Sequence, residues 1–282
     1  LELRGNILGF HDAKPLFDGR LEASRLSLQS LYDDWPAGVA TSLKAALIKR
    51  FSGGSFTNAI FDFAGGIDRR TMQLDLAKLE MNTAFSGIRM NASAGQIQRL
   101  VGTIDGGLGL QIDVGGQVRG MDFTFGLTQG SMQLADSETA MSIDNLTIAA
   151  GLSGRDLSIE TVDLQLADGG QVTVEGKARL SPSWGLQGLD LDLQTAALTI
   201  DQFHAIWPNW VVPDTRQWVR DKIPSGMVSN ARLRLGSSVT PAGMALDNMS
   251  AEVVLDAAQI MLGGNIPTFD EVAADIVLDE RT

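Results

Sequence analysis

Apolar and polar residues alternate along most of this chain with a period of two. The cleanest apolar runs are Leu108, Leu110, Ile112 and Val114, followed by Met121, Phe123, Phe125 and Leu127. The residues between them are mostly Asp, Gln, Thr and Gly. A period of two places successive side chains on opposite faces of a strand, so the pattern predicts β-strands with one apolar and one hydrated face.

Residues 55–200 show this alternation throughout and contain no convincing helical period. Short turn signals, Ala64-Gly65-Gly66 and Asp168-Gly169-Gly170, favour antiparallel neighbours. One helix shields only a stripe of sheet, so the apolar face of so many strands must be covered by curling. The sequence therefore predicts a mainly β fold: a long antiparallel meander curled into an elongated trough or open barrel with an apolar inner face, plus two short helices.

A tryptophan-rich stretch, residues 203–235, interrupts the alternation. Pro213 is suited to a first helical turn, and Pro224-Ser225-Gly226 is typical of a helix stop. Between them the apolar spacing predicts a helix over 213–222, with Trp218 and Val219 facing inward. After Gly226 the period returns to two.

The same arrangement occurs earlier in the chain. Trp35-Pro36 precedes Trp207-Pro208 by 207 − 35 = 172 residues, and Gly54 then falls on Gly226 without a gap. This match predicts a large internal repeat, with a first helix over 36–50. We expect one continuous sheet divided into the end of a preceding β unit (1–30), a complete helix-plus-meander repeat (31–202) and the start of a second repeat (203–282). The expected structural anchors are Trp35, Pro36, Trp207, Pro208, Trp218 and Gly226.

Composition excludes several classes of function. The net charge of −12 argues against binding to nucleic acid or to an anionic membrane surface, because both require clustered Lys and Arg. The chain has no cysteine, no signal peptide pattern and no apolar run near the ~18–20 residues that span a bilayer. It lacks an initiator Met, and both ends fall in strand-like sequence, so we expect a piece of a longer protein.

No residue set predicts catalysis. His11 and His204 are the only histidines, and nothing in the sequence brings them together as metal ligands. The aspartates follow the period of the hydrated face, and no Gly-x-Ser-x-Gly motif is present. We therefore expect no enzymatic activity, no metal and no cofactor.

The apolar positions admit two interpretations: an ordinary core, or a lining that contacts lipid, for which flexible Met side chains are well suited. The candidate lining residues are Leu74, Leu76, Met81, Met90, Leu108, Leu110, Ile112, Val114, Phe123, Phe125, Leu127, Leu164 and Leu191.

Residues 198–282 resemble AsmA-like envelope proteins of the YhdP type. The resemblance rests on Trp207-Pro208, Pro213, Arg216-Gln217-Trp218-Val219 and Gly226, and continues through Ala258 to Gly263, Ile266-Pro267 and Asp275 to Leu278. The first copy departs from the pattern, with Thr41 in place of Pro213 and Lys44-Ala45-Ala46 in place of Arg216-Gln217-Trp218. The resemblance implies a large protein of Gram-negative bacteria, anchored in the inner membrane, with a periplasmic β-trough that moves phospholipid toward the outer membrane.

These observations predict a non-enzymatic segment of a periplasmic lipid-conducting trough, with phospholipid or another acyl-chain lipid as its partner and its membrane anchor outside this segment. One alternative is a structural or assembly scaffold of the envelope whose trough is filled by its own side chains. An outer-membrane barrel segment is a further alternative, but it requires aromatic girdles, and this chain has one Tyr. A hydrolase lacks a visible nucleophile and base.

Overall fold

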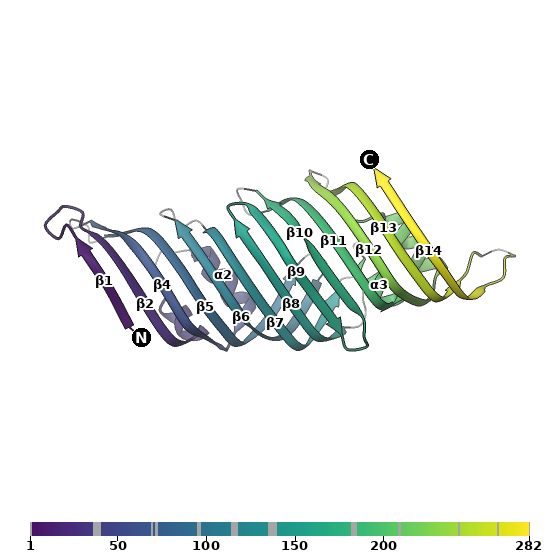
Figure 1. The fold of residues 1–282 in the computed structure, drawn as a ribbon, viewed down its shortest axis with the longest axis horizontal. Coiled ribbons are helices and arrows are strands. Elements are labelled where there is room, and N and C mark those ends of the chain that lie inside the picture. The colour runs from purple at the N-terminus through teal and green to yellow at the C-terminus, as the bar shows by residue number, and fades with distance from the viewer. Residues whose placement is uncertain are drawn as a thin grey trace. The chain divides into compact units, whose positions relative to one another are not determined.

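The computed structural model describes residues 2–35, 41–68, 70, 73–94, 97–113, 118–134, 140–181, 185–207, 210–241, 243–263 and 265–281. Most of these residues lie in strands, and the helices fall at two places in the chain (Figure 1). The elements in chain order are β1 (Glu2–Leu8), β2 (Leu16–Ser27), α1 (Leu28–Asp33), α2 (Thr41–Arg50), β3 (Phe51–Ser52), β4 (Ser55–Asp68), β5 (Gln73–Ala94), β6 (Ile97–Asp113), β7 (Val118–Leu134), β8 (Met141–Ser153), β9 (Asp156–Leu166), β10 (Gln171–Leu180), β11 (Leu186–Thr199), α3 (Ile200–Ile206), α4 (Pro213–Lys222), β12 (Ser225–Thr240), β13 (Gly243–Ile260) and β14 (Phe269–Arg281).

The strands form one 14-stranded sheet that follows chain order. From β1 to β14 each long strand pairs with the next, and the two-residue β3 pairs with β5. The pairs with a defined register, among them β2 with β4 and β11 with β12, are antiparallel. β1 and β14 stand at opposite ends of the order, so the described strands make an open sheet. The predicted mainly β fold with a long antiparallel meander is confirmed.

The chain divides into two compact units. The first comprises Leu1–Ala92, Val101–Leu127 and Ala149–Gly154, and the second comprises Ser93–Leu100, Thr128–Ile148 and Arg155–Thr282. In the view of Figure 1, α2 lies behind the strands of the first unit and α3 lies behind strands of the second. Each unit is described separately below.

The strands of the first unit have one apolar and one charged face. Leu21 of β2 lies opposite Phe61 of β4, which in turn lies opposite Met81 of β5. One residue further along each strand, Arg20 and Asp62 form an ion pair at 3.8 Å on the other face. The alternation of the sequence is therefore realised in the register of these strands.

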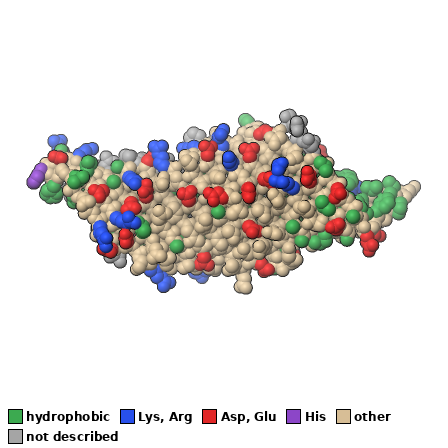
Figure 2. Space-filling model, in the orientation of Figure 1, with side chains coloured by type: hydrophobic (Ala, Val, Ile, Leu, Met, Phe, Trp, Pro, Cys, Tyr) green, Lys and Arg blue, Asp and Glu red, His purple; other side chains and the backbone are tan. Residues whose placement is uncertain are grey.

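The second unit is built in the same way. Leu191 of β11 lies opposite Leu235 of β12, which lies opposite Met249 of β13. The neighbouring positions Asp192 and Arg234 are paired on the opposite face. Figure 2 shows acidic and basic side chains over the strands on the visible face, whereas the helices lie behind.

β-bulges shift the phase of the alternation inside single strands. Asn58 has a φ of 52° and lies where the β4–β5 register shifts, and Ala257, with a φ of 50°, lies at a shift between β13 and β14. An extra residue at a bulge moves the following side chains to the other face. In β4 the buried apolar positions consequently change from Phe56 to Ala59.

The helices recur at the spacing found in the sequence. α2 and α4 each have ten residues, and their starts differ by 213 − 41 = 172 residues. The predicted helix over 213–222 is confirmed, and the described part of 36–50 is helical from Thr41. The expected number of two helices is wrong, because α1 and α3 precede them, with starts that also differ by 200 − 28 = 172 residues.

Local sequence explains why α1 and α3 form. Each begins at the last residue of a strand, where a hydroxyl side chain accepts a hydrogen bond from a backbone N–H of the first turn: Ser27 from Ser30 at 2.9 Å and Thr199 from Gln202 at 3.2 Å. In α3 the Gln202 side chain also accepts from the Thr199 N–H at 2.8 Å, which completes a capping box. The division of the sequence at residues 30 and 202 stays a prediction.

Candidate functional site

The apolar face of the first unit contains most of the predicted lining residues. Met90, Leu110, Ile112 and Leu127 are buried there, whereas Met81, Leu108, Phe123 and Phe125 are half-buried. Exposed residues such as Gln111 and Asp122 alternate with them, as a period of two predicts within β6 and within β7. Leu74 and Leu76 lie in β5 opposite Ile67 and Gly65, and Val114 lies outside the described residues.

Two half-buried phenylalanines lie next to each other on this apolar face. The rings of Phe123 and Phe125 in β7 are stacked, with centroids 6.3 Å apart and planes inclined by 13°. On the neighbouring strand β6, Gly106 has no side chain, and a Cβ added there meets the Thr124 carbonyl oxygen and lies 2.9 Å from Phe85 Cζ. The missing side chain leaves room for aromatic rings to lie against the sheet, which makes this part of the face broad and apolar.

In the second unit, part of the apolar face packs against residues of the α3–α4 connection. Val211, which is 1% exposed, forms a cluster with Leu235 and Met249. Packed against this cluster are Leu191, Trp207, Trp210, Val212, Leu233, Leu246 and Leu278. The predicted lining residue Leu191 is packed against this cluster, and Leu164 of β9 is buried as well.

Trp207 holds the α3–α4 connection in place through polar contacts as well as packing. Its indole N–H donates to the Val211 carbonyl oxygen at 2.8 Å, and its ring lies edge-on to Phe203 with centroids 5.4 Å apart. Arg216 of α4 donates to the carbonyl oxygens of Trp207 at 3.1 Å and His204 at 3.3 Å. These bonds tie α3 to the first turns of α4 above the apolar strands.

The residue before α4 has an unusual backbone. Val212 has a φ of 38° and a ψ of 64°, in the left-handed region that β-branched residues rarely adopt. Pro213 follows it at the first helical position and disfavours the right-handed α conformation for Val212. Burial of Val211 and the bonds of Trp207 and Arg216 offset the cost of this conformation.

The predicted anchor residues differ in how deeply the structure buries them. Trp35 and Trp207 are half-buried, and Pro36 and Pro208 lie outside the described residues. The prediction that Trp218 faces inward is wrong, because its side chain is 46% exposed. α4 is polar apart from a narrow stripe, and Val219 together with Ile223 after its end supplies the buried positions.

Gly226 occupies a backbone position that favours glycine. Its φ is 142°, and an added Cβ lies 2.7 Å from the Ala258 Cα of β13. Gly54, its counterpart in the first copy, has a φ of 71°, and an added Cβ lies 2.6 Å from the Ile88 backbone nitrogen. Each glycine therefore allows the chain leaving the helices to approach the next strand closely.

Charges on the opposite face form local networks. Asp192 accepts hydrogen bonds from Arg232 at 2.7 Å and from Arg234 at 3.0 Å. The Arg232 bond, with that of Arg234, lowers the pKa of Asp192 below its ordinary value. This pairing ties β11 to β12 on the hydrated face.

Two titratable aromatic side chains occupy equivalent positions, since 204 − 32 = 172. Burial raises the pKa of Tyr32, whose hydroxyl donates to the Phe51 carbonyl oxygen at 3.5 Å. Burial also lowers the pKa of His204, and the positive charges of Arg216 and Arg220 act in the same direction. His204 stacks on Trp207, with ring centroids 6.4 Å apart.

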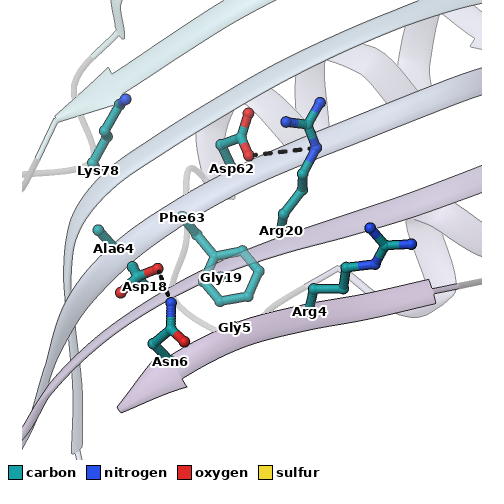
Figure 3. Close-up of a pocket in the computed structure, with 10 residues that line it drawn as sticks. All are labelled: Arg4, Gly5, Asn6, Asp18, Gly19, Arg20, Asp62, Phe63, Ala64 and Lys78. Atoms are coloured by element: carbon teal, nitrogen blue, oxygen red, sulfur yellow. Dashed lines mark hydrogen bonds and ion pairs between the residues drawn. The ribbon is translucent and has the colours of Figure 1, made fainter. Parts of the chain in front are cut away.

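A hollow of about 370 Å³ lies beside β1, β2, β4 and β5 in the first unit (Figure 3). It is lined by Arg4, Gly5, Asn6, Asp18, Gly19, Arg20, Asp62, Phe63, Ala64 and Lys78. Its cations are paired with acids: Arg20 with Glu22 at 2.9 Å and Lys78 with Glu80 at 3.0 Å. Mixed, exposed and internally paired charges make this hollow a poor binding site for an ion of either sign.

The described residues contain no group of three or more His, Cys, Asp or Glu side chains placed to hold a metal ion. Among the helices that the structure describes, none combines the length and the apolar character needed to cross a membrane. No protein-family model, curated protein or solved structure matches this chain. The candidate functional surface is therefore the apolar face of the sheet.

Sequence reasoning missed the covering role of the α3–α4 connection. Helical spacing points to Trp218 and Val219 of the following helix, and gives no covering role to Trp210, Val211 and Val212. The available signal was the density of large apolar residues in Trp207, Trp210, Val211 and Val212, which exceeds what a short polar helix needs. The counterpart of Val211 in the first copy, Val39, lies outside the described residues.

Proposed function

We propose that this chain is a segment of a periplasmic lipid-conducting β-trough that moves phospholipid between the inner and outer membranes. Acyl chains lie along the apolar face, and head groups stay in water at its margin. The chain performs no chemistry on the lipid, and its inner-membrane anchor belongs to another segment of the protein. The location, the anchor and the direction of transport follow from the resemblance to AsmA-like proteins.

The observation that supports this proposal is the partial exposure of Phe123, Phe125 and Leu108 on an otherwise apolar face. Each acyl methylene that leaves water for such a surface gains about 0.8 kcal/mol. Because that gain is non-directional, a conduit needs a broad apolar surface and no specific polar contacts. The stacked pair Phe123–Phe125 offers such a surface in the first unit.

A structural scaffold of the cell envelope is the second candidate function. It is favoured by the cluster around Val211, where the chain fills its own apolar face in the second unit. If every apolar surface is filled in this way, no room remains for lipid. The two functions therefore differ in whether the first unit carries lipid in solution.

Mass spectrometry of an organic extract of the purified chain tests the proposal. We expect phospholipid in the extract of the unmodified chain and its loss in Phe125→Asp, because an unpaired carboxylate beside hydrocarbon costs several kcal/mol. Thr124→Asp is the matched control: Thr124 is exposed on the opposite face of the same strand, so this variant should retain its lipid. Circular dichroism verifies that both variants are folded.

Absence of lipid from the unmodified chain contradicts the conduit and favours the scaffold. Equal lipid content in Phe125→Asp and Thr124→Asp also contradicts it. Ile112→Asp is less informative, because Ile112 is 5% exposed and a buried charge there unfolds the strand pair under either function.

A further inference from the structure

The connection between β13 and β14 exposes a set of apolar side chains in the second unit. Figure 2 shows hydrophobic side chains gathered at the end where Figure 1 draws this connection. The exposed members are Met261 at 38%, Leu262 at 43%, Ile266 at 49% and Phe269 at 45%. Residues 257–269 contain no charged side chain. We call these four residues the apolar tip.

The apolar tip is attached to the end of α4. The Met261 N–H donates to the Lys222 carbonyl oxygen at 2.8 Å, and the Lys222 ammonium donates to the Leu262 carbonyl oxygen at 3.5 Å. Trp218, one helical turn before Lys222, is 46% exposed. The exposed tryptophan and the lysine therefore belong to the same end of the unit as the tip.

This combination matches the chemistry of a membrane–water interface. Apolar side chains on a charge-free turn can enter the acyl boundary, and Trp and Lys are favoured at the head-group level, where an apolar body and a polar end are both satisfied. Acidic residues flank the site, namely Asp221 on α4 and Asp270 and Glu271 after the tip. Their charge disfavours anionic lipid, so the matching surface is a zwitterionic one.

We propose that the apolar tip, with Trp218 and Lys222 at its rim, inserts into the surface of a zwitterionic phospholipid bilayer. The proposal rests on the proposed lipid-conducting function and adds the place where the chain meets a membrane. Insertion is driven by burial of Leu262, Ile266 and their neighbours in the tip, and it leaves the sheet outside the hydrocarbon.

Flotation of the purified chain with phosphatidylcholine vesicles tests this insertion. We expect the unmodified chain to float with the vesicles, and the double variant Leu262→Asp/Ile266→Asp to bind at least about tenfold more weakly. The matched control is Val239→Asp, since Val239 is 44% exposed but pairs with Met244, at the opposite ends of β12 and β13 from the tip. Its binding should stay within about twofold of the unmodified chain.

Two further measurements identify the mode of binding. Brominated phosphatidylcholine should quench part of the tryptophan fluorescence, and Trp218→Phe should remove that quenched part. Phosphatidylglycerol in the vesicles should not strengthen binding, and about 0.5 M salt, where the Debye length is only a few Å, should not weaken it.

Failure of the unmodified chain to float, equal binding by the double variant and the unmodified chain, or binding that depends on anionic lipid each overturns the proposal. Equal losses in the double variant and Val239→Asp overturn it too, because the tip is then not the contact. The lipid content of the purified chain separates the two proposals. Vesicle binding without bound lipid supports the tip and contradicts the conduit, whereas bound lipid without vesicle binding does the reverse.

Discussion

The described parts of the two helix pairs, α1 with α2 and α3 with α4, share their element order, a hydroxyl cap and a following glycine, but differ in the side chains that make their described contacts. Both begin with a hydroxyl cap, at Ser27 and Thr199, and both are followed by a glycine in close contact with a later strand. Leu28 and Ile200, the first residues of α1 and α3, are each 3% exposed. The contacts that follow differ, because Tyr32 reaches Phe51 in the first copy whereas Trp207 and Arg216 bind α3 to α4 in the second.

This difference separates the sequence features that both copies of the repeat share from the side chains that differ between the copies. Caps and glycines act on the backbone, so they keep their places when the contacting side chains change. The side chains that cover the sheet decide whether the apolar face is filled. The following substitutions test that division, beginning with the largest expected effect.

Trp207→Ala should destabilise the α3–α4 connection by about 3 kcal/mol, because it removes a large side chain from the Val211 cluster and leaves the Val211 carbonyl oxygen without its donor. Hydrogen exchange of α3 and α4, followed by mass spectrometry, measures the loss of protection. Trp218→Ala is the matched control, with an expected change within about 0.5 kcal/mol because Trp218 is exposed. Equal effects of the two substitutions contradict the anchoring role of Trp207.

Leu28→Ala and Ile200→Ala should each cost about 2–3 kcal/mol, since both side chains are buried at the start of their helices. Similar losses of stability are expected if Leu28 and Ile200 are packed alike in the two copies. Hydrogen exchange in α1 and α3 measures both losses. Ile48→Ala, at a position that is 49% exposed on α2, should cost little. A loss in one copy more than twice that in the other shows that the equivalent positions are not packed alike.

Much of the sheet could be predicted from the sequence, but its strand boundaries could not. Alternation identified the apolar face correctly because one-sided burial imposes a period of two. The predicted turn at Ala64-Gly65-Gly66 is wrong, since these residues lie inside β4. The single 22-residue strand β5 contains Leu74, Leu76, Met81 and Met90, although the period of two is interrupted between Leu76 and Met81 and between Met81 and Met90. The interruptions come from bulges such as the one at Asn58, which change the phase without ending the strand.

The candidate site was predictable in part for the same reason. Helical spacing alone does not show which of the adjacent side chains, Trp218 or Val219, is buried. That depends on which strand the helix packs against. The helices α1 and α3 were missed because each is a short continuation of a strand, and their signal is confined to a cap. The packing of Val211 against Leu235 and Met249 depends on a left-handed backbone at Val212. A β-branched residue rarely adopts that conformation, so the sequence did not predict it.

The caps should have a smaller effect than the core positions. Ser27→Ala and Thr199→Ala should each reduce helix stability by about 1 kcal/mol, with the larger loss at Thr199, where Gln202 completes the capping box. Hydrogen exchange in the first turns of α1 and α3 measures the change. Thr199→Asp should restore most of the stability, because a carboxylate also caps a helix start. Failure of this rescue implies that the Thr199 methyl group, and not its hydroxyl, is the stabilising part.

The smallest expected effect is a pH dependence of opposite direction in the two copies. The pKa of His204 is lowered in the folded chain, so below its ordinary value of 6.5 the unfolded chain binds a proton that the folded chain does not. Stability of α3–α4 should therefore fall as the pH drops below 6.5 toward the lower folded pKa.

The pKa of Tyr32 is raised from 10.0, so above that value the unfolded chain loses a proton that the folded chain keeps, and α1–α2 should weaken as the pH rises. Unfolding midpoints at pH 5, 7.5 and about 10.5 measure both effects. His204→Tyr should abolish the acid loss and leave the alkaline loss of the first copy in place. An acid loss that persists in His204→Tyr assigns it to other groups, and removes His204 as the titratable difference between the copies.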